Sequence, residues 1–354
     1  MWKNYYFWVG ILFSVIFITS ILFTFAGIKE IFRTILEVNI LFLVLASLVY
    51  LFSLWFRAER WKILILPLIG KNKRNILSVV TVGYMANNIL PIRIGEFIRS
   101  FYLSVREEIS VPATFGTIVI ERLADILILC LLLFLSGLFS FIWSKEIFLM
   151  IESSVSLDGL VLFSLTFFPF MIFILIFFLS LYKQKFIENI ISLFTFFLPK
   201  RIQKVFLDIY KKFIKGIFVV SNPIIILKVI LFSFPVWICE IIVAYIIAEA
   251  FDLISYLNSF EELVIAMISF TVISNLAGII PSTSGGWGPY DFFGALTLHS
   301  FGFDPVISAS FTITVHIVLW IPPTIIGIII LWFDKTSIFE LISKSKKFSN
   351  IIRK

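Results

Sequence analysis

Two stretches of this 354-residue chain place charged and helix-breaking residues inside apolar sequence. The first runs from residue 87 to residue 99 and contains Pro91; the second runs from residue 278 to residue 291 and contains Pro281. Proline and glycine at this density cannot continue a regular helix. Because lipid offers no hydrogen bonds to the freed backbone, such a break belongs inside protein or beside a water-filled cavity. Both stretches are therefore candidates for a binding or translocation site.

The first stretch offers groups that bind anions, and Asn88 lies ahead of its charged residues. A helix that starts near Gly95 points its N-terminal amides at the break, where phosphate or carboxylate is favoured. Arg93 adds a guanidinium that can hold phosphate through two hydrogen bonds. Glu96 and Arg99 lie one turn apart and can pair, so a purely structural role, in which this pair locks the break, stays open.

A second charged cluster, Glu121-Arg122-x-x-Asp125, has apolar runs on both sides. On a helix, Glu121 and Asp125 share a face, and Arg122 reaches Asp125 from three residues away. One arginine beside two carboxylates leaves a local negative charge unless another arginine approaches. The candidates for that approach are Arg57, Arg60, Arg93 and Arg99. We expect a buried network that joins this helix to the first stretch, in a functional or a purely structural role.

The second stretch contributes mainly backbone groups. Its Gly-Gly-x-Gly run, Gly285, Gly286 and Gly288, can cradle an oxyanion with main-chain amides. Asp291 follows Pro289, and a proline at a helix start with an acid in the first turn is good capping chemistry. A cap is therefore the structural alternative for Asp291.

Two further polar residues, Glu240 and His316, lie within apolar segments. Ionisable groups in such places are candidates for a proton or polar relay, and the alternative is an interior residue held by hydrogen bonds. The indoles of Trp237, Trp287 and Trp320 read either as anchors at the membrane interface or as cavity walls.

Several chemistries lack a signal in the sequence. There is no Walker loop, nucleophile elbow or comparable catalytic motif, so we expect no enzyme activity in this chain. The two histidines are far apart, and Cys130 and Cys239 lie singly in apolar segments, which does not match an ordinary zinc site or a disulfide framework. We expect no metal, no cofactor and no nucleic-acid partner.

Composition places these residues in a membrane protein, since 60% of the chain is hydrophobic and 14% is charged. About 20 apolar residues span a bilayer. Six segments qualify: Phe7–Gly27, Ile40–Phe56, Ile126–Trp143, Gly159–Tyr182, Ile224–Ala248 and Pro305–Phe333. Two more, Ile76–Leu103 and Leu263–Ser300, are broken near their middles. The predicted fold is all-α and polytopic, with residues 1–335 as a single membrane domain and residues 336–354 as a short basic tail.

The distribution of charge predicts the topology. Basic residues concentrate in Arg57–Arg74, Lys183–Lys215 and Asp334–Lys354, and acidic residues in Ser144–Asp158 and Glu249–Glu262. The positive-inside rule then places the basic segments and both termini in the cytoplasm. Each broken segment must return to the side it entered from, so we expect two oppositely oriented re-entrant hairpins, as in an inverted repeat. Lys200–Ile217 in addition has the pattern of an amphipathic helix at the membrane surface.

Four motifs carry a resemblance to a known family: Phe56-Arg-Ala-Glu-Arg-Trp61, Gly83-Tyr-Met-Ala-Asn-Asn-Ile-Leu-Pro-Ile-Arg-Ile-Gly-Glu-Phe-Ile-Arg99, Glu121-Arg-Leu-Ala-Asp125 and Ile280-Pro-Ser-Thr-Ser-Gly-Gly-Trp-Gly-Pro-Tyr-Asp291. Together they resemble the flippase-like transmembrane region of lysylphosphatidylglycerol synthases. The resemblance implies a region that moves lipids between leaflets, without the soluble transferase domain of the bifunctional members. The family's second motif usually ends in an Arg-Glu-like pair. Here Tyr290 and Asp291 take those places, so the head-group preference stays open.

We therefore expect a lipid translocase in the plasma membrane of a prokaryote, carrying an anionic phospholipid or a polyprenyl-phosphate-linked precursor. The alternative is a membrane subunit of a lipid-modifying enzyme, for aminoacyl or glycosyl transfer, whose catalytic domain is a partner chain. A scaffold without either activity is a third interpretation. The sequence leaves the cargo, the direction, the energy source and assembly into a homo-oligomer open.

Overall fold

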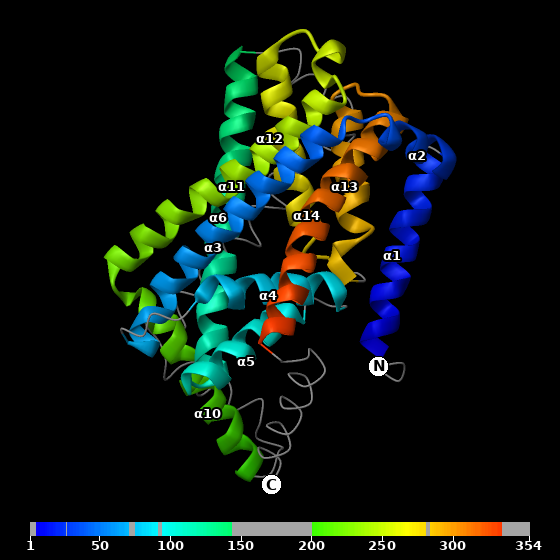
Figure 1. Cartoon of the computed structure of the whole chain (residues 1–354). Helices are drawn as coiled ribbons and strands as arrows, with labels where there is room; N and C mark the ends of the chain where they lie inside the picture. The colour runs from blue at the N-terminus through cyan, green and yellow to red at the C-terminus, as the bar shows by residue number, and fades with distance from the viewer. Residues whose placement is uncertain are drawn as a thin grey trace.

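The computed structural model describes residues 5–25, 27–70, 75–90, 94–143, 200–280 and 284–334. These residues form eleven α-helices and three short 3-10 helices, with no strand among them. Four of the helices are long and apolar enough to cross a membrane: α3 (Ile40–Ile69), α11 (Pro223–Ala250), α12 (Phe260–Ala277) and α14 (Pro305–Phe333). The chain is an all-helical, multi-pass membrane protein (Figure 1).

The remaining long helices are α1 (Tyr5–Thr24), α6 (Val111–Trp143) and α10 (Lys200–Ile217). The structure confirms the predicted bounds of α10 and α14. The predicted span Ile224–Ala248 lies within α11, whereas α1 ends at Thr24, before the predicted end of the first span at Gly27. The expected span Gly159–Tyr182 lies outside the described residues, as do the acidic segment Ser144–Asp158 and the basic tail.

Two helices are longer than the sequence predicted. Helix α3 continues beyond the predicted end at Phe56 to Ile69, so Arg57 and Arg60 lie in the helix. Helix α6 begins at Val111, well before the predicted Ile126, and therefore contains the Glu121–Asp125 cluster. Both helices continue through charged residues because those charges neutralise one another inside the bundle.

Each broken segment contains two packed helices. The first pair is α4 (Ile76–Ile89) and α5 (Gly95–Glu107), and the second is α12 and α13 (Pro289–Ser300). The 3-10 turn η3 (Ser284–Gly286) lies in the second break and packs against α4. In Figure 1 the α12–α13 pair occupies the upper part of the bundle and the α4–α5 pair the lower part, with α4 running across its neighbours.

Local sequence signals explain where these helices begin. The Asn75 side chain accepts a hydrogen bond from the Ser78 amide at the start of α4, and Ser259 accepts one from the Glu262 amide at the start of α12. Asp304 caps α14 ahead of Pro305. A capping side chain satisfies an amide that has no partner within the helix.

Glycines allow the closest contacts between helices. A Cβ on Gly216 of α10 would lie 1.9 Å from the Ala113 carbonyl oxygen of α6, and one on Gly327 of α14 would lie 2.4 Å from the Met85 side chain of α4. Small residues at helix crossings are typical of membrane bundles.

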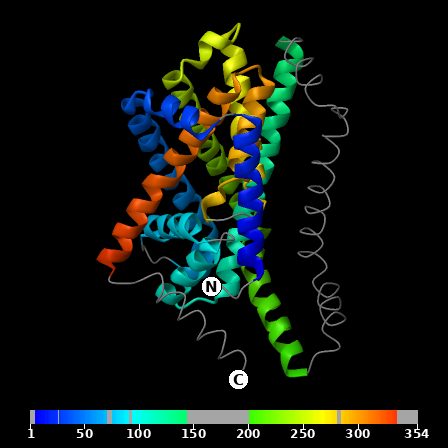
Figure 2. The same ribbon diagram turned by 90° about the vertical axis from the view of Figure 1, so that its right-hand side faces the viewer.

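The remaining short elements are α2 (Ile28–Leu36), η1 (Phe218–Ser221) and η2 (Leu253–Tyr256). Both Figure 1 and Figure 2 show α10 projecting from the lower end of the bundle.

Gly95, the first residue of α5, has no room for a side chain. A Cβ there would lie 2.3 Å from the Gly83 carbonyl oxygen and 2.4 Å from the Asn87 amide nitrogen, both backbone atoms of α4. We predict that Gly95→Ala forces the α4–α5 pair apart and destabilises the protein by about 1–3 kcal/mol. Thermal unfolding in detergent measures the change.

Gly137→Ala is the matched control, because Gly137 lies in α6 with open space around its Cβ position. Alanine is a better helix former than glycine, so this variant should be as stable as the parent or more so. Equal melting temperatures for the two variants would contradict the close approach at Gly95.

Candidate functional site

Residues on both sides of each break line one cavity of ≈ 360 Å³ inside the helix bundle. Its walls come from eight α-helices and from the 3-10 turn of the second break. The lining residues are Tyr50, Arg57, Tyr84, Asn87, Asn88, Glu96, Arg122, Asp125, Ile126, Leu129, Trp237, Glu240, Asn275, Gly278, Ile279, Gly285, Gly286, Tyr290, His316, Leu319 and Trp320. Charged, amide and aromatic side chains predominate in a bundle that is otherwise apolar, which is typical of a ligand site.

Behind one wall of the cavity lies a set of fully buried ion pairs. The Arg60 guanidinium donates to Asp125 at 2.5 Å and to Glu121 at 2.9 Å. Arg99 donates to the other oxygen of Glu121 at 2.8 Å, and its guanidinium stacks 3.8 Å from the centre of the Trp61 ring. Charges this deep are stable only when paired and hydrogen-bonded, so the network joins α3, α5 and α6 firmly.

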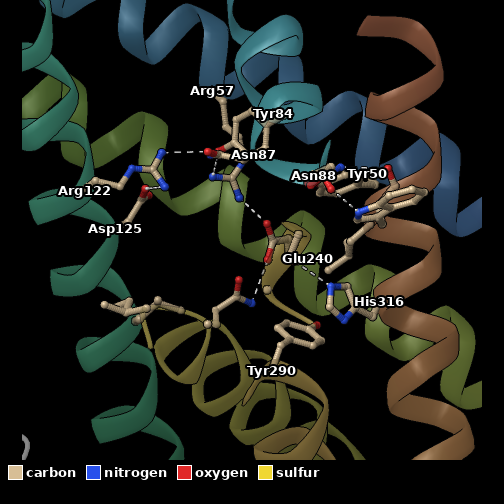
Figure 3. Close-up of a pocket in the computed structure, with 18 of the residues that line it drawn as sticks. Tyr50, Arg57, Tyr84, Asn87, Asn88, Arg122, Asp125, Glu240, Tyr290 and His316 are labelled. Carbon is tan, nitrogen blue, oxygen red and sulfur yellow. Dashed lines mark hydrogen bonds and ion pairs between the residues drawn. The ribbon is translucent and has the colours of Figure 1, made fainter. Parts of the chain in front are cut away.

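A second ion pair links α3 to α11. The Arg57 guanidinium donates to the Tyr84 hydroxyl at 2.7 Å and forms an ion pair with the Glu240 carboxylate. The other oxygen of Glu240 accepts a hydrogen bond from the Asn275 amide at 3.1 Å. Glu240 is therefore held by an arginine and an asparagine, which favours the structural alternative for this residue over an isolated proton carrier. Figure 3 shows the whole chain of contacts.

Arg122 is the accessible member of the charged set. Its guanidinium lies 3.0 Å from Glu121 and 3.5 Å from both Glu96 and Asp125. The Arg122 side chain is 29% exposed, whereas that of Arg60 is 0% exposed. Counting Arg57 and Arg99, four arginines face the four carboxylates of Glu96, Glu121, Asp125 and Glu240. The formal charges balance, and Arg122 presents its guanidinium to the cavity.

The second break is tied to α14 through a histidine. The ring nitrogens of His316 lie 2.7 Å from the Asp291 carboxylate and 3.0 Å from the Gly285 carbonyl oxygen. The other oxygen of Asp291 accepts the Gly288 amide hydrogen at 2.9 Å, which confirms the predicted cap. Asp291 therefore caps α13 and also binds a residue of α14, which the sequence alone did not indicate.

The first break is tied to α14 as well. The Asn88 side-chain amide donates to the Trp320 carbonyl oxygen and to the Thr324 hydroxyl, each at 2.9 Å. The Trp320 indole donates back to the Asn88 carbonyl oxygen at 3.1 Å. This reciprocal pair fixes the C-terminal end of α4 beside the cavity.

The structure brings most of the sequence-predicted residues together. On the cavity surface lie Asn88, Glu96, Arg122, Asp125, Gly285, Gly286, Glu240 and His316. Next to this surface, in contact with its residues, lie Gly95, Arg99, Glu121, Gly288 and Asp291. Pro91, Arg93 and Pro281 lie outside the described residues. Among the described residues, no cluster of three or more His, Cys, Asp or Glu side chains could hold a metal ion.

One expected pair does not form. Glu96 faces Arg122 of α6 rather than Arg99, and Arg99 binds Glu121 instead. Glu121 offers Arg99 a fully buried carboxylate that also accepts from Arg60, so the longer-range contact is better satisfied than the local one. The expected network between the Glu121 helix and the first stretch is confirmed by these same contacts.

Sequence reasoning missed several cavity residues: Tyr50, Tyr84 and Asn275 as lining groups, and Arg57 as the partner of Glu240. A signal existed for Arg57 and Arg60, because two arginines three residues apart in an apolar segment indicate a buried helix face that needs carboxylate partners. Of the three tryptophans, Trp237 and Trp320 line the cavity, and Trp287 stacks on His316.

Comparisons with known proteins agree on the relationship. A family model described as the lysylphosphatidylglycerol synthase TM region matches residues 7–327. A UPF0104 membrane protein of Methanocaldococcus jannaschii is 26% identical over 343 residues, which cover 92% of this chain and 94% of that protein. No solved structure matches.

Glu121 tests the buried network. We predict that Glu121→Gln destabilises the protein by about 3–5 kcal/mol, because Arg60 and Arg99 lose a shared counter-charge in a place without water. Unfolding by heat or denaturant in detergent measures the loss. Glu37→Gln is the matched control, since Glu37 pairs with Arg33 on the surface and is 68% exposed. A Glu121→Gln protein as stable as the control would refute a stabilising role for the network.

Proposed function

Because the chain belongs to the family of the lysylphosphatidylglycerol synthase transmembrane region, we propose that it moves an anionic phospholipid or a lipid-linked precursor between the leaflets of a membrane. The observation that carries the proposal is the charged cavity between the two helix breaks. A lipid head group needs such a polar passage, because charged and polar groups are costly in hydrocarbon. The acyl chains need none and stay in the lipid.

The proposed binding group for the lipid phosphate is Arg122. The carboxylates around Arg60 and Arg99 are satisfied behind the cavity wall, so those arginines hold the wall together. Arg122 has the freedom to exchange a carboxylate for a phosphate oxygen, since its pairs with Glu96 and Asp125 are both 3.5 Å long. A guanidinium binds phosphate through two parallel hydrogen bonds, and its planar shape suits that geometry.

Backbone groups at the breaks support the same role. Helix α5 begins at Gly95, so its first amides lie at the first break, close to Glu96 and the cavity. Gly285 and Gly286 place main-chain atoms on the cavity surface at the second break. A helix N-terminus and glycine-rich backbone both suit an anion, and Arg93 would add a further cation at the first break.

We propose that the two helix pairs are re-entrant hairpins of opposite orientation, as in transporters with inverted repeats. In support, the pairs occupy opposite parts of the bundle in Figure 1 and their breaks line the same cavity. The proposed location is the plasma membrane, with both termini in the cytoplasm. This arrangement suits alternating access, since each pair can open the cavity toward one side.

The name of the matched family also fits a second function, a membrane subunit that presents lipid to a transferase on another chain. The two functions differ in one observable: a translocase moves lipid alone, whereas a subunit requires its partner. Purification from the native membrane without crosslinking, followed by identification of bound soluble proteins, tests for that partner.

Purified protein in vesicles tests translocation directly. Fluorescent phosphatidylglycerol, a labelled polyprenyl phosphate and labelled phosphatidylcholine are placed in both leaflets, and a membrane-impermeant reagent destroys the outer label. Movement of the two anionic probes above the rate in empty vesicles supports the proposal. No movement of any probe above that rate, with correctly folded protein, refutes it.

The Arg122→Gln variant tests directly whether Arg122 binds the lipid phosphate. We predict that it slows transfer of the anionic probes by about tenfold or more, the equivalent of one lost charge-assisted hydrogen bond to phosphate. Arg33→Gln on α2 is the control, because Arg33 is 83% exposed and lies on a surface helix. Equal transfer rates for the two variants, with melting temperatures unchanged, would remove Arg122 from the binding role.

A further inference from the structure

His316 of α14 is placed between two hydrogen-bond acceptors. One ring nitrogen lies 2.7 Å from the Asp291 carboxylate oxygen and the other lies 3.0 Å from the Gly285 carbonyl oxygen. A neutral imidazole has one N–H donor and one acceptor nitrogen, whereas the imidazolium has two donors. A carbonyl oxygen cannot donate, and the Asp291 carboxylate accepts on its other oxygen from the Gly288 amide. Both contacts are satisfied together when each ring nitrogen carries a proton.

Aromatic rings cover the imidazole. The Trp287 ring stacks on it with 4.1 Å between ring centres and an angle of 19° between the planes. The Tyr290 ring centre lies 4.6 Å away, tilted by 48°. Indole and phenol faces attract a cation. The surroundings of the ring therefore stabilise a positive charge from its faces as well as from its edge.

Asp291 of α13 is in direct hydrogen-bond contact with the ring, and Tyr290 of α13 lies against its face. The other ionisable residues that line the cavity are Tyr50, Arg57, Tyr84, Glu96, Arg122, Asp125 and Glu240, from α3, α4, α5, α6 and α11. Glu96, Arg122 and Asp125 pair with one another or with Glu121 and Arg60. Arg57 and Glu240 pair with each other. Asp291 is consequently the counter-charge to a protonated His316.

We propose that His316 is a proton-binding site in the cavity wall, and that its second proton clamps the glycine turn of the second break onto α14. The clamp acts on a glycine-rich turn, which also contacts α4 and, through Trp287, the His316 ring. Gly285, Gly286 and Gly288 have φ values of 75°, 87° and 105°, and they carry no side chains that could pack. The turn is fastened by the His316 bond to Gly285, the Asp291 bond to Gly288, and a 2.7 Å bond from the Ser14 hydroxyl to the Trp287 carbonyl oxygen.

Loss of the proton removes one of these fastenings. A neutral His316 keeps a single donor, so either the Asp291 contact or the Gly285 contact becomes a contact between two acceptors. The Gly285 carbonyl is then free to turn into the cavity, together with the backbone that lines it. Proton occupancy thus sets whether the second break is fastened or released.

The chain allows a direct test, because it contains only two histidines. The protein is labelled with nitrogen-15 in its histidines and placed in lipid nanodiscs, and the ring nitrogens are observed by NMR at neutral pH. His299→Gln leaves His316 as the sole signal. His299 is also the internal comparison in the parent protein, since among the described residues its ring has a hydrogen-bond contact with one acceptor, the Phe303 carbonyl oxygen at 3.0 Å.

The expected result is that both His316 nitrogens carry a proton at neutral pH and have the shifts of an imidazolium, as its two acceptors require. As pH rises, loss of one His316 proton should coincide with faster hydrogen exchange at the Gly288 amide. A neutral His316 tautomer at neutral pH overturns the proposal, as does exchange at Gly288 that does not follow the titration. These measurements use the folded parent chain, so they do not depend on a variant that fails to fold.

A second readout rests on the proposed function. In the vesicle assay the transfer rate of the parent should change over the pH range in which His316 titrates, and His316→Gln should lose that response. His299→Gln should keep it. If the NMR signature is present but no probe moves at any pH, the proton site stands and the proposed lipid transfer fails. A pH response that survives in His316→Gln overturns the clamp.

Discussion

The structure depends on the pairing of buried arginines with buried carboxylates. Arg60 and Arg99 converge on Glu121, and this contact links α3, α5 and α6 at one point. Neither charge could remain in an apolar bundle alone, because removing a lone ion from water costs several kcal/mol. The pairing therefore specifies which helix faces meet. It also explains why α3 and α6 continue as helices through residues that read as the ends of spans.

The cavity follows from the same pairing. With the inner charges neutralised, the outer ones, Arg122 and Glu96, remain on the cavity surface, where the proposed lipid head group would bind. At the second break, Gly285 and Gly286 place backbone groups on the same surface. Paired charges on one side and glycine backbone on the other thus form the walls of the cavity.

The sequence predicted the elements better than the contacts between them. Apolar length and capping residues located α14 and α10 to the residue, and proline with glycine located both breaks. Local spacing, however, suggested a Glu96–Arg99 pair, whereas the structure joins each residue to α6. The Arg57–Glu240 and Asp291–His316 contacts connect residues 183 and 25 positions apart, and no periodicity in one chain reveals such partners. Long-range pairing of charges decided the site, and it emerges only when the helices are packed.

Trp320 has a mechanical consequence for the whole molecule. Its indole donates to the Asn88 carbonyl at the end of α4, and the indole nitrogen would lie 2.6 Å from any Cβ placed on Gly285. The Trp320 indole therefore lies between the two helix breaks. If either break moves outward, the indole must move as well, and its contact with the other break changes. In the proposed translocase, this shared contact would couple movement at one break to movement at the other, which disfavours a passage open at both ends at the same time.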